Sequence, residues 1–207
     1  MKTTGGATKS STMKVLTRVW EEGIKHDYDL GLLPNEKTLQ AAIYHRVLSE
    51  SMGLNVFVEI NKFMGRSDFI PDLIVANKDR HVEAVIELKL KSNEGIRYED
   101  DCDKLVDWAK AGASGRCEDT LELDPASMEW RSKDEAPYLL DERTSWVFAA
   151  IGKYDCGALD NAKVFSHIKK AIEQGSGKQV PSISSFWLFS GIVQGDRGTQ
   201  FQVKRGC

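Results

Sequence analysis

Three charged side chains occur in the most apolar part of the sequence. Asp72 stands within an apolar run at residues 70–76, and Glu87 and Lys89 interrupt a second run at residues 82–90. Burying an isolated charge costs several kcal/mol in practice, so each group needs a partner or a chemical role. Two neighbouring carboxylates repel each other, and a divalent cation that prefers oxygen ligands, such as Mg²⁺ or Mn²⁺, removes that repulsion. A nearby lysine can orient or deprotonate a water, or stabilise charge that develops on a phosphate.

The two apolar runs predict neighbouring strands of a hairpin, because turn-forming residues 77–80 separate them. A two-residue turn would place Asp72 opposite Val85 and diagonal to Glu87. Side chains alternate along a strand, so Asp72, Glu87 and Lys89 are expected on one face. The other face is expected to hold apolar side chains, namely Leu73, Ala84, Ile86, Leu88 and Leu90. The simpler alternative is an ion pair between Lys89 and one carboxylate, without any chemistry.

The spacing of these residues resembles the PD-(D/E)XK nuclease superfamily. Pro71-Asp72 is followed, after fourteen residues, by Glu87-Leu88-Lys89. The expected order of elements over residues 36–153, a helix, three strands, a helix and a strand, is similar to that of the superfamily core. The resemblance implies an α/β fold with a restriction-endonuclease-like core. In that fold a central mixed sheet is flanked by helices in the order αβββαβ, here with an extra N-terminal helix and C-terminal strands.

The resemblance also implies an activity, that of a Mg²⁺-dependent endonuclease that hydrolyses DNA phosphodiester bonds in restriction, phage defence or repair. Asp72 and Glu87 would bind the metal, with the backbone carbonyl of Leu88, and Mn²⁺ could replace Mg²⁺. Lys89 would position or activate the attacking water. A non-catalytic or partner-regulated nucleic-acid-binding module on the same fold is the alternative, and cleavage of both strands would imply a homodimer.

Five further residues are candidates for the same site. The superfamily often adds an acidic residue on its first core helix. Glu36 and Glu50 are the candidates here, Glu36 being the preferred metal ligand, with Gln40 one turn later on the same face. Glu36 is equally explained as a charge favoured at a helix N-terminus. Arg66 and Lys91 are candidate nucleic-acid contacts, although each is also an ordinary solvated charge.

The remaining apolar periodicity predicts the elements that hold these residues. Helices are expected at residues 12–26, 36–52, 96–111 and 159–174, and further strands at 55–62, 145–153, 184–193 and 198–204. Residues 1–11 are expected to be a disordered tail and residues 12–207 a single nuclease-like domain, in which residues 114–144 form an insertion.

Individual positions in these elements are also assigned. Asn35 is predicted to cap the second helix and Gly53 to end it. Apolar residues at helical spacing are expected to be buried: Leu16, Val19, Trp20 and Ile24, then Leu39, Ile43 and Val47, then Tyr98, Cys102, Leu105 and Ala109. The third helix is expected to turn four charged residues toward water: Asp100, Asp103, Lys104 and Asp107. In the strand at residues 55–62, the alternating buried positions are expected to be Val56, Val58 and Ile60.

Length and composition limit the class of protein. The 207 residues are 41% hydrophobic and 29% charged, an ordinary globular composition. No apolar run approaches the ~18 residues that cross a membrane, and residues 1–12 have no apolar core, so we expect a cytoplasmic protein without a membrane segment or secretory signal. Four widely spaced cysteines predict free thiols, and the scattered histidines give no zinc pattern.

The net charge of −3 conceals two regions of opposite sign. Residues 94–144 hold 15 acidic and 7 basic residues, which leaves 16 acidic and 21 basic residues in the rest of the chain. The framework that carries the candidate site is therefore mildly basic. The charge limits non-specific affinity for DNA but does not argue against a phosphate substrate.

Overall fold

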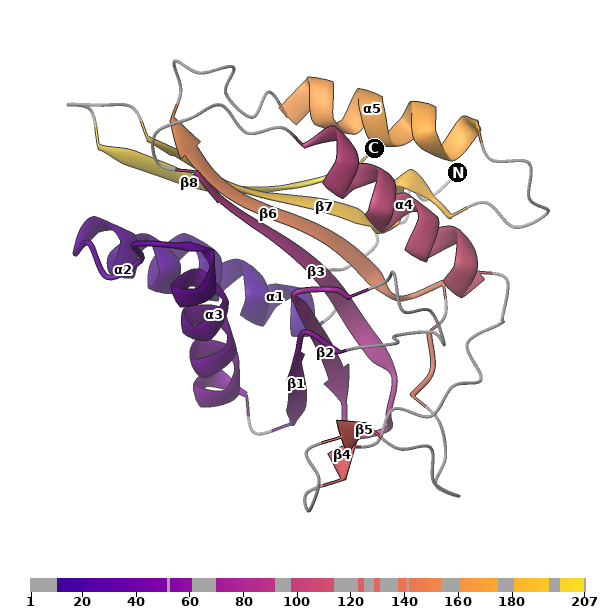
Figure 1. Ribbon diagram of the computed structural model, residues 1–207, viewed down its shortest axis with the longest axis horizontal. Coiled ribbons are helices and arrows are strands. Elements are labelled where there is room, and N and C mark those ends of the chain that lie inside the picture. The colour runs from indigo at the N-terminus through magenta and orange to yellow at the C-terminus, as the bar shows by residue number, and fades with distance from the viewer. Residues whose placement is uncertain are drawn as a thin grey trace, which may run out of the picture.

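The computed structural model has a six-stranded mixed sheet with helices on both faces (Figure 1). It describes residues 11–51, 53–60, 70–91, 98–113, 123–124, 129–130, 138–140, 142–153, 161–174, 181–193 and 198–206. The predictions for the tail, for Arg66 and for most of the insertion fall outside these residues. Ser11, which was assigned to the tail, is the first residue of a helix.

The sheet combines two antiparallel margins with a parallel centre. Its order is β1 (Leu54–Val58), β2 (Leu73–Asn77), β3 (Val82–Lys91), β6 (Ser145–Lys153), β7 (Phe186–Val193) and β8 (Thr199–Arg205). The β3–β6 and β6–β7 pairs are parallel, and the other pairs are antiparallel. Two short strands, β4 (Leu123–Asp124) and β5 (Glu129–Trp130), form a separate pair.

The helices that precede β1 cover one face of the sheet, and the helices that follow β3 cover the other (Figure 1). One face, here called the α3 face, lies under α1 (Ser11–Arg18), a π-helix at Val19–Ile24, α2 (Lys25–Asp29) and α3 (Glu36–Glu50). The other, the α4 face, lies under α4 (Glu99–Ala113) and α5 (Asn161–Glu173). A short 3₁₀-helix at Ile183–Ser185 precedes β7.

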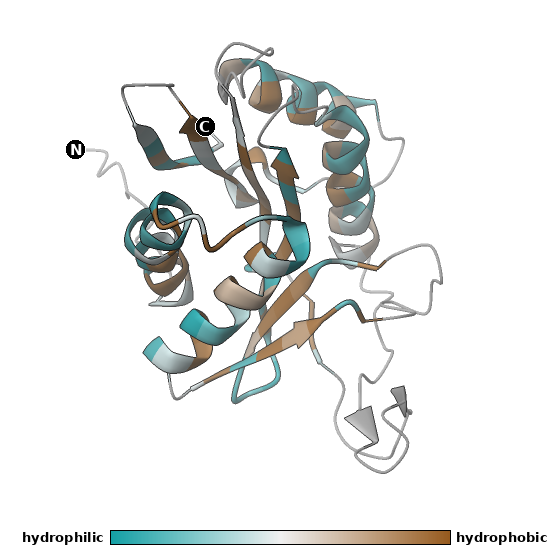
Figure 2. Cartoon of the chain, turned by 60° about the vertical axis from the view of Figure 1, so that its left-hand side comes forward, coloured by the Kyte–Doolittle hydropathy of each residue, from teal (hydrophilic) through white to brown (hydrophobic). Residues whose placement is uncertain are grey.

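The central strands are apolar on both sides, as strands between two helical layers must be. Along β6, Phe148 and Ala150 are buried on the α4 face, whereas Val147 and Ala149 are buried on the α3 face. The strands in the middle of Figure 2 are accordingly brown, and the outer surfaces of the helices carry most of the teal residues. The continuous apolar runs seen in the sequence therefore reflect burial on two faces.

The first helical segment is longer than predicted, and it changes from α-helix to π-helix and back. It continues past residue 26 to Asp29, and Val19–Ile24 within it is a π-helix. Its predicted apolar face is confirmed, since four side chains are buried: Leu16, Val19, Trp20 and Ile24. Gly23 lies in the π segment against Arg46, and a Cβ there would come within 2.7 Å of Arg46 Cδ. A larger residue at this position would require the Arg46 side chain, which is paired with Asp27, to shift.

The second helix begins where predicted and ends earlier. The Asn35 side chain accepts a hydrogen bond from the amide of Thr38 at 3.0 Å, and the Thr38 hydroxyl reciprocates by accepting from the Asn35 amide, forming a capping box. Leu39, Ile43 and Val47 are buried as expected. The helix ends at Glu50, not at residue 52, because Ser51 already has extended backbone angles. The prediction that Gly53 stops the helix is therefore wrong.

The first strand departs from the predicted alternation. Val56 is buried on the α3 face, but Val58 is 38% exposed, so the prediction that Val58 is buried is wrong. β1 ends at Val58, and the φ of 45° at Glu59 takes the backbone after it out of the extended conformation, so the alternation does not continue to Ile60. Ile60 is buried as predicted, but on the opposite, α4 face.

The predicted hairpin between β2 and β3 is confirmed, with a different register. Leu73 pairs with Ile86 and Ile74 with Val85, so Val85 does not face Asp72. The two-residue turn is wrong because Asn77 closes a longer loop, in which its amide donates to the His81 carbonyl at 2.9 Å. The pairing also shifts between Val75 and Ala76, which leaves Glu83 as an extra residue in β3.

The later elements follow the predictions closely. Four side chains of or beside α4 pack inward as expected: Tyr98, Cys102, Leu105 and Ala109. Cys102 is a buried free thiol. β7 and β8 lie where the last two strands were predicted and form an antiparallel hairpin. None of the described helices is long and apolar enough to span a bilayer.

Candidate functional site

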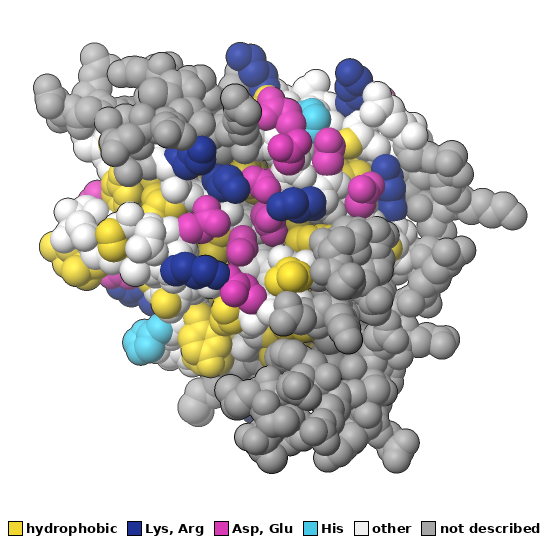
Figure 3. Space-filling view, in the orientation of Figure 1, with side chains coloured by type: hydrophobic (Ala, Val, Ile, Leu, Met, Phe, Trp, Pro, Cys, Tyr) yellow, Lys and Arg dark blue, Asp and Glu magenta, His cyan; other side chains and the backbone are white. Residues whose placement is uncertain are grey.

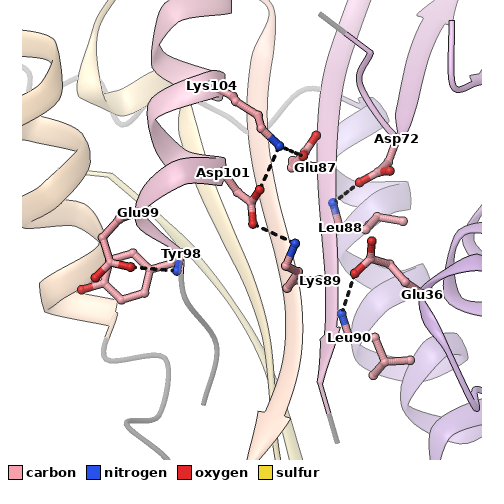
Figure 4. Close-up of polar contacts among 10 residues, drawn as sticks. All are labelled: Glu36, Asp72, Glu87, Leu88, Lys89, Leu90, Tyr98, Glu99, Asp101 and Lys104. Atoms are coloured by element: carbon pink, nitrogen blue, oxygen red, sulfur yellow. Dashed lines mark hydrogen bonds and ion pairs between the residues drawn. The ribbon is translucent and has the colours of Figure 1, made fainter. Parts of the chain in front are cut away.

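The hairpin brings the two candidate carboxylates together. Because Leu73 pairs with Ile86, the next positions, Asp72 and Glu87, lie across from each other where β2 begins. Asp72 Oδ2 accepts a hydrogen bond of 2.7 Å from the Leu88 amide (Figure 4). The shift from the predicted register is two residues, so the predicted faces are kept and the two carboxylates are closer than expected.

Glu87 is buried with one oxygen unsatisfied. The residue is 6% exposed, and its Oε1 accepts from Lys104 Nζ at 3.2 Å. Its Oε2 is buried and has no hydrogen-bond partner among the described residues. Burial and then the Asp72 charge raise the pKa of Glu87 to about 8. A carboxylate in this position is stabilised by an added cation.

Asp72 is held more fully than Glu87. Burial raises its pKa, the hydrogen bond from the Leu88 amide acts in the opposite direction, and the Glu36 charge raises it further. Its backbone carbonyl accepts hydrogen bonds from the Gln40 side chain at 2.8 Å and from the Glu59 amide at 3.2 Å. The position of Asp72 is thus fixed by β3, by α3 and by the residue after β1, and among the described residues its second carboxylate oxygen accepts no hydrogen bond.

Lys89 is tied to α4 by a carboxylate that the sequence analysis did not single out. Lys89 Nζ lies 3.1 Å from Asp101 Oδ2, and Lys104 Nζ lies 3.1 Å from Asp101 Oδ1 (Figure 4). Asp101 is 5% exposed. The signal that could have found it is spacing, since Asp101 lies one helical turn before Leu105, which was predicted to be buried.

Lys104 was predicted to face water, but it also contacts the site. Its side chain is 48% exposed, yet its ammonium group contacts both Glu87 and Asp101. The reason is the length of the side chain, which lets an outer helix position reach the underlying strand. Four ionisable side chains therefore form a continuous chain of contacts across β3 and α4, in the order Lys89, Asp101, Lys104 and Glu87.

Both ammonium groups stay protonated near neutral pH. Burial lowers the pKa of Lys89, but the Asp101 carboxylate, through its charge and its hydrogen bond, raises it more, so the pKa ends above its usual value. For Lys104 burial also lowers the pKa, and the charge of Glu87 with the contacts to Asp101 outweighs it. Lys89 is consequently a fixed cation and not a proton acceptor, which favours a positioning role over base catalysis.

α3 brings two of the sequence-predicted residues to the strand ends. Glu36 Oε2 accepts from the Leu90 amide at 3.2 Å, and Gln40 contacts Asp72 as described above. Glu36 lies in the first turn of α3, so a helix-terminal charge and a site residue coincide here. Lys91, the last residue of β3, is half-buried two residues beyond Lys89.

Glu59 is a neighbour of the site that was not among the sequence-predicted residues. Its backbone is left-handed, its amide donates to the Asp72 carbonyl, and its side chain forms an ion pair with Lys37 and lies 3.5 Å from Gln40 Nε2. Non-glycine residues in this conformation are often held there by the surrounding structure at functional sites. A glutamate at a strand end is too common for the sequence to reveal this.

The donor set fits a hard divalent cation. Among the described residues no three His, Cys, Asp or Glu side chains are already gathered as a metal site. Two carboxylates with raised pKa values face each other, however, and Glu87 Oε2 lacks a partner within the described structure. The Leu88 amide points toward Asp72, and in a strand the carbonyl of the same residue points the same way. These are the oxygen ligands that Mg²⁺ and Mn²⁺ favour.

Charges of both signs surround this pair at the surface. Figure 3 shows acidic and basic side chains interleaved over the face in view. Asp100, Asp103 and Asp107 are exposed on α4, beside the half-exposed Lys104. A polyanion approaching from this side meets a balanced surface, so tight binding through bulk charge is not expected.

Comparisons with known proteins assign no family. No family model matches the chain, and no curated protein matches it in sequence. Among solved structures, the chain is similar to Pyrococcus furiosus SfsA, determined in complex with Ca²⁺, with 11% sequence identity and a TM-score of 0.36. The match covers 82% of this chain, which spans 64% of the length of that protein.

Proposed function

We propose that the chain is a metal-dependent nuclease of the PD-(D/E)XK type that hydrolyses DNA phosphodiester bonds. The observation that supports this most is the pairing of Asp72 with Glu87 on adjacent strands, with Lys89 two residues further along the same face. The order of elements from α3 to β6 is also consistent with a restriction-endonuclease-like core, apart from the short β4–β5 pair within the proposed insertion.

Each residue has a distinct role in this proposal. Asp72 and Glu87, with the carbonyl of Leu88, would hold Mg²⁺ or Mn²⁺. Bound there, the metal would polarise the phosphodiester and lower the pKa of a water. Lys89 remains an ammonium group, so it orients the water or a phosphate oxygen and does not take a proton. Gln40 holds the backbone of Asp72, and Glu36 stands beside it as a further candidate ligand.

DNA is the proposed partner because the framework outside residues 94–144 is mildly basic and the site chemistry suits a phosphate. With the charges balanced around the site, binding should be modest and should weaken as salt rises. Arg66 and Lys91 remain the candidate backbone contacts. Cleavage of both strands would be served by a homodimer, with one site for each strand.

The test is cleavage of plasmid and oligonucleotide DNA in Mg²⁺ or Mn²⁺, with RNA in parallel. Asp72→Asn and Lys89→Ala should each remove most of the activity, whereas Asp107→Asn, an exposed change on α4, should leave it unchanged. Undiminished cleavage in both site variants would overturn the proposal, since contaminating nucleases do not depend on these residues.

A non-catalytic or partner-regulated nucleic-acid-binding module is the second candidate. It is favoured by the ion pairs themselves, because Lys89, Asp101, Lys104 and Glu87 already compensate one another within the chain. Calorimetry separates the two candidates. The nuclease should bind Mg²⁺ or Mn²⁺ through Asp72, whereas the module should bind neither metal and should retain its DNA affinity in Asp72→Asn.

A further inference from the structure

Asp101 connects the two ammonium groups of the site through separate oxygens. Its Oδ2 lies 3.1 Å from Lys89 Nζ and its Oδ1 lies 3.1 Å from Lys104 Nζ. Lys89 comes from β3, whereas Lys104 comes from the same helix as Asp101 (Figure 4). One buried carboxylate thus joins the strand that carries the candidate chemistry to the helix that covers it.

The carboxylate is rigid because of what surrounds it. Cys102 and Leu105, adjacent to it and one turn away on α4, are fully buried against the sheet, which fixes the start of the helix. Lysine side chains are long and flexible, so an ammonium group occupies one place only when a fixed partner holds it. Asp101 is such a partner for both lysines.

We propose that Asp101 is a positioning residue that holds Lys89 and Lys104 as two fixed positive charges beside the Asp72–Glu87 pair. The inference rests on the proposed nuclease function and adds a residue and a second cation to it. Lys104 Nζ also contacts Glu87 Oε1 at 3.2 Å. When Glu87 takes another partner, Asp101 keeps Lys104 next to the pair, where it can stabilise negative charge on a phosphate.

Kinetics of DNA cleavage test the positioning role. Asp101→Asn keeps the size of the side chain and removes its charge, and we expect kcat to fall about 100-fold with a smaller change in KM, because misplaced catalytic groups affect the transition state most. Asp107→Asn, the matched change on the exposed side of α4, should stay within about twofold of the unmodified protein, as surface changes usually do. Asp101→Glu should restore part of the loss.

A second variant covers the case in which Asp101→Asn does not fold. Lys104→Gln alters a half-exposed side chain and leaves the buried carboxylate paired with Lys89. We expect it to lower kcat about 10-fold, since one of two stabilising charges is lost. A kcat equal to that of Asp107→Asn, in either Asp101→Asn or Lys104→Gln, would overturn the inference when the unmodified protein cleaves DNA.

A measurement without catalysis separates this inference from the proposed function. Lysine ammonium groups can be followed by ¹⁵N NMR in the metal-free protein, with Lys169, exposed on α5, as the mobile reference. Lys89 should be ordered in the unmodified protein and as mobile as Lys169 in Asp101→Asn. If Lys89 stays ordered in the variant, the inference is wrong whatever the activity. If the protein cleaves nothing but Lys89 is released, the nuclease proposal fails and the positioning role of Asp101 stands.

Discussion

The two faces of the sheet are both covered by helices, but the side chains that β3 contributes to them differ in chemistry. On the α3 face, β3 contributes Ile86 and Leu88, which are buried among apolar side chains. On the α4 face, the same strand contributes Glu87 and Lys89, which meet charged groups of α4. One strand therefore serves as core on one side and as candidate site on the other. Substitutions on the α3 face should alter stability, and substitutions on the α4 face should alter chemistry.

The largest expected effect is on the chemistry of the α4 face. Asp72→Asn should reduce DNA cleavage about 1,000-fold, because a metal ligand and its charge are removed. The free energy of unfolding should be unchanged or slightly higher, since burial and nearby negative charge already disfavour the ionised form of Asp72. Urea unfolding measured beside the kinetics checks both. A parallel loss of stability would contradict the proposed difference between the faces.

The matching change on the α3 face should lower stability and leave cleavage nearly unchanged. Ile86 is buried, and Ile86→Ala should reduce the free energy of unfolding by about 3 kcal/mol through the lost contacts and the cavity left behind. Cleavage per folded molecule should remain near normal at a temperature where the variant is folded. Chemical denaturation and activity assays on the same preparation decide this. Loss of activity without loss of stability would show that the α3 face contributes to the site directly.

A smaller effect is expected from pH in the absence of divalent metal. The pKa of Glu87 is about 8 in the folded protein, against 4.5 for the ordinary group, so the folded state holds a proton that the unfolded state has released. Stability from this group is therefore fully present below about pH 4.5 and is lost by a few kcal/mol as pH rises through about 8. Thermal melts of the unmodified protein and Glu87→Gln should diverge over this range. If the melting temperatures of the two proteins change with pH in the same way, the raised pKa of Glu87 is wrong.

The smallest effect concerns the cap of the helix that reaches the site from the α3 face. Asn35→Ala should lower the free energy of unfolding by about 1 kcal/mol, because the amide of Thr38 loses its acceptor. Asn35→Ser, which keeps a capping oxygen, should lose much less. Because α3 also carries Gln40 and Glu36, a modest change in cleavage with Asn35→Ala would show how far the two faces are coupled. A larger loss in the serine variant would exclude capping as the cause.

The parts of the fold that depend on local pattern were predictable. Alternation along β3 assigned Glu87 and Lys89 to one face and Ile86 and Leu88 to the other, and the structure agrees. The Asn35 cap and the apolar face of α3 were also correct. These features follow from neighbouring residues, so a single sequence contains the information.

The errors arose where one backbone conformation or one long side chain decides the outcome. Ile60 was assigned to the same face as Val56 but lies on the opposite one, because Glu59 adopts a left-handed conformation that its residue type does not signal. Lys104 was assigned to water because helical periodicity describes where a side chain starts, not how far it reaches. Asp101 was missed because its partner on β3, Lys89, is brought to it only by the fold.

The extra residue in β3 has a consequence for how the two carboxylates meet. Near the turn Ala76 pairs with Val82, but beyond Glu83 the partner of Val75 is Ala84. If the first pairing continued without this shift, Asp72 would face Ile86 and would share a face with apolar side chains. The extra residue shifts the partner of every β2 residue beyond it by one position along β3. Because of this shift the pairing places Asp72 opposite Glu87 and not opposite Ile86. The Asn77 side chain, in the turn, donates to Glu83 Oε1 at 2.7 Å. A residue of the turn therefore binds the extra residue that determines which side chains of β2 and β3 face each other.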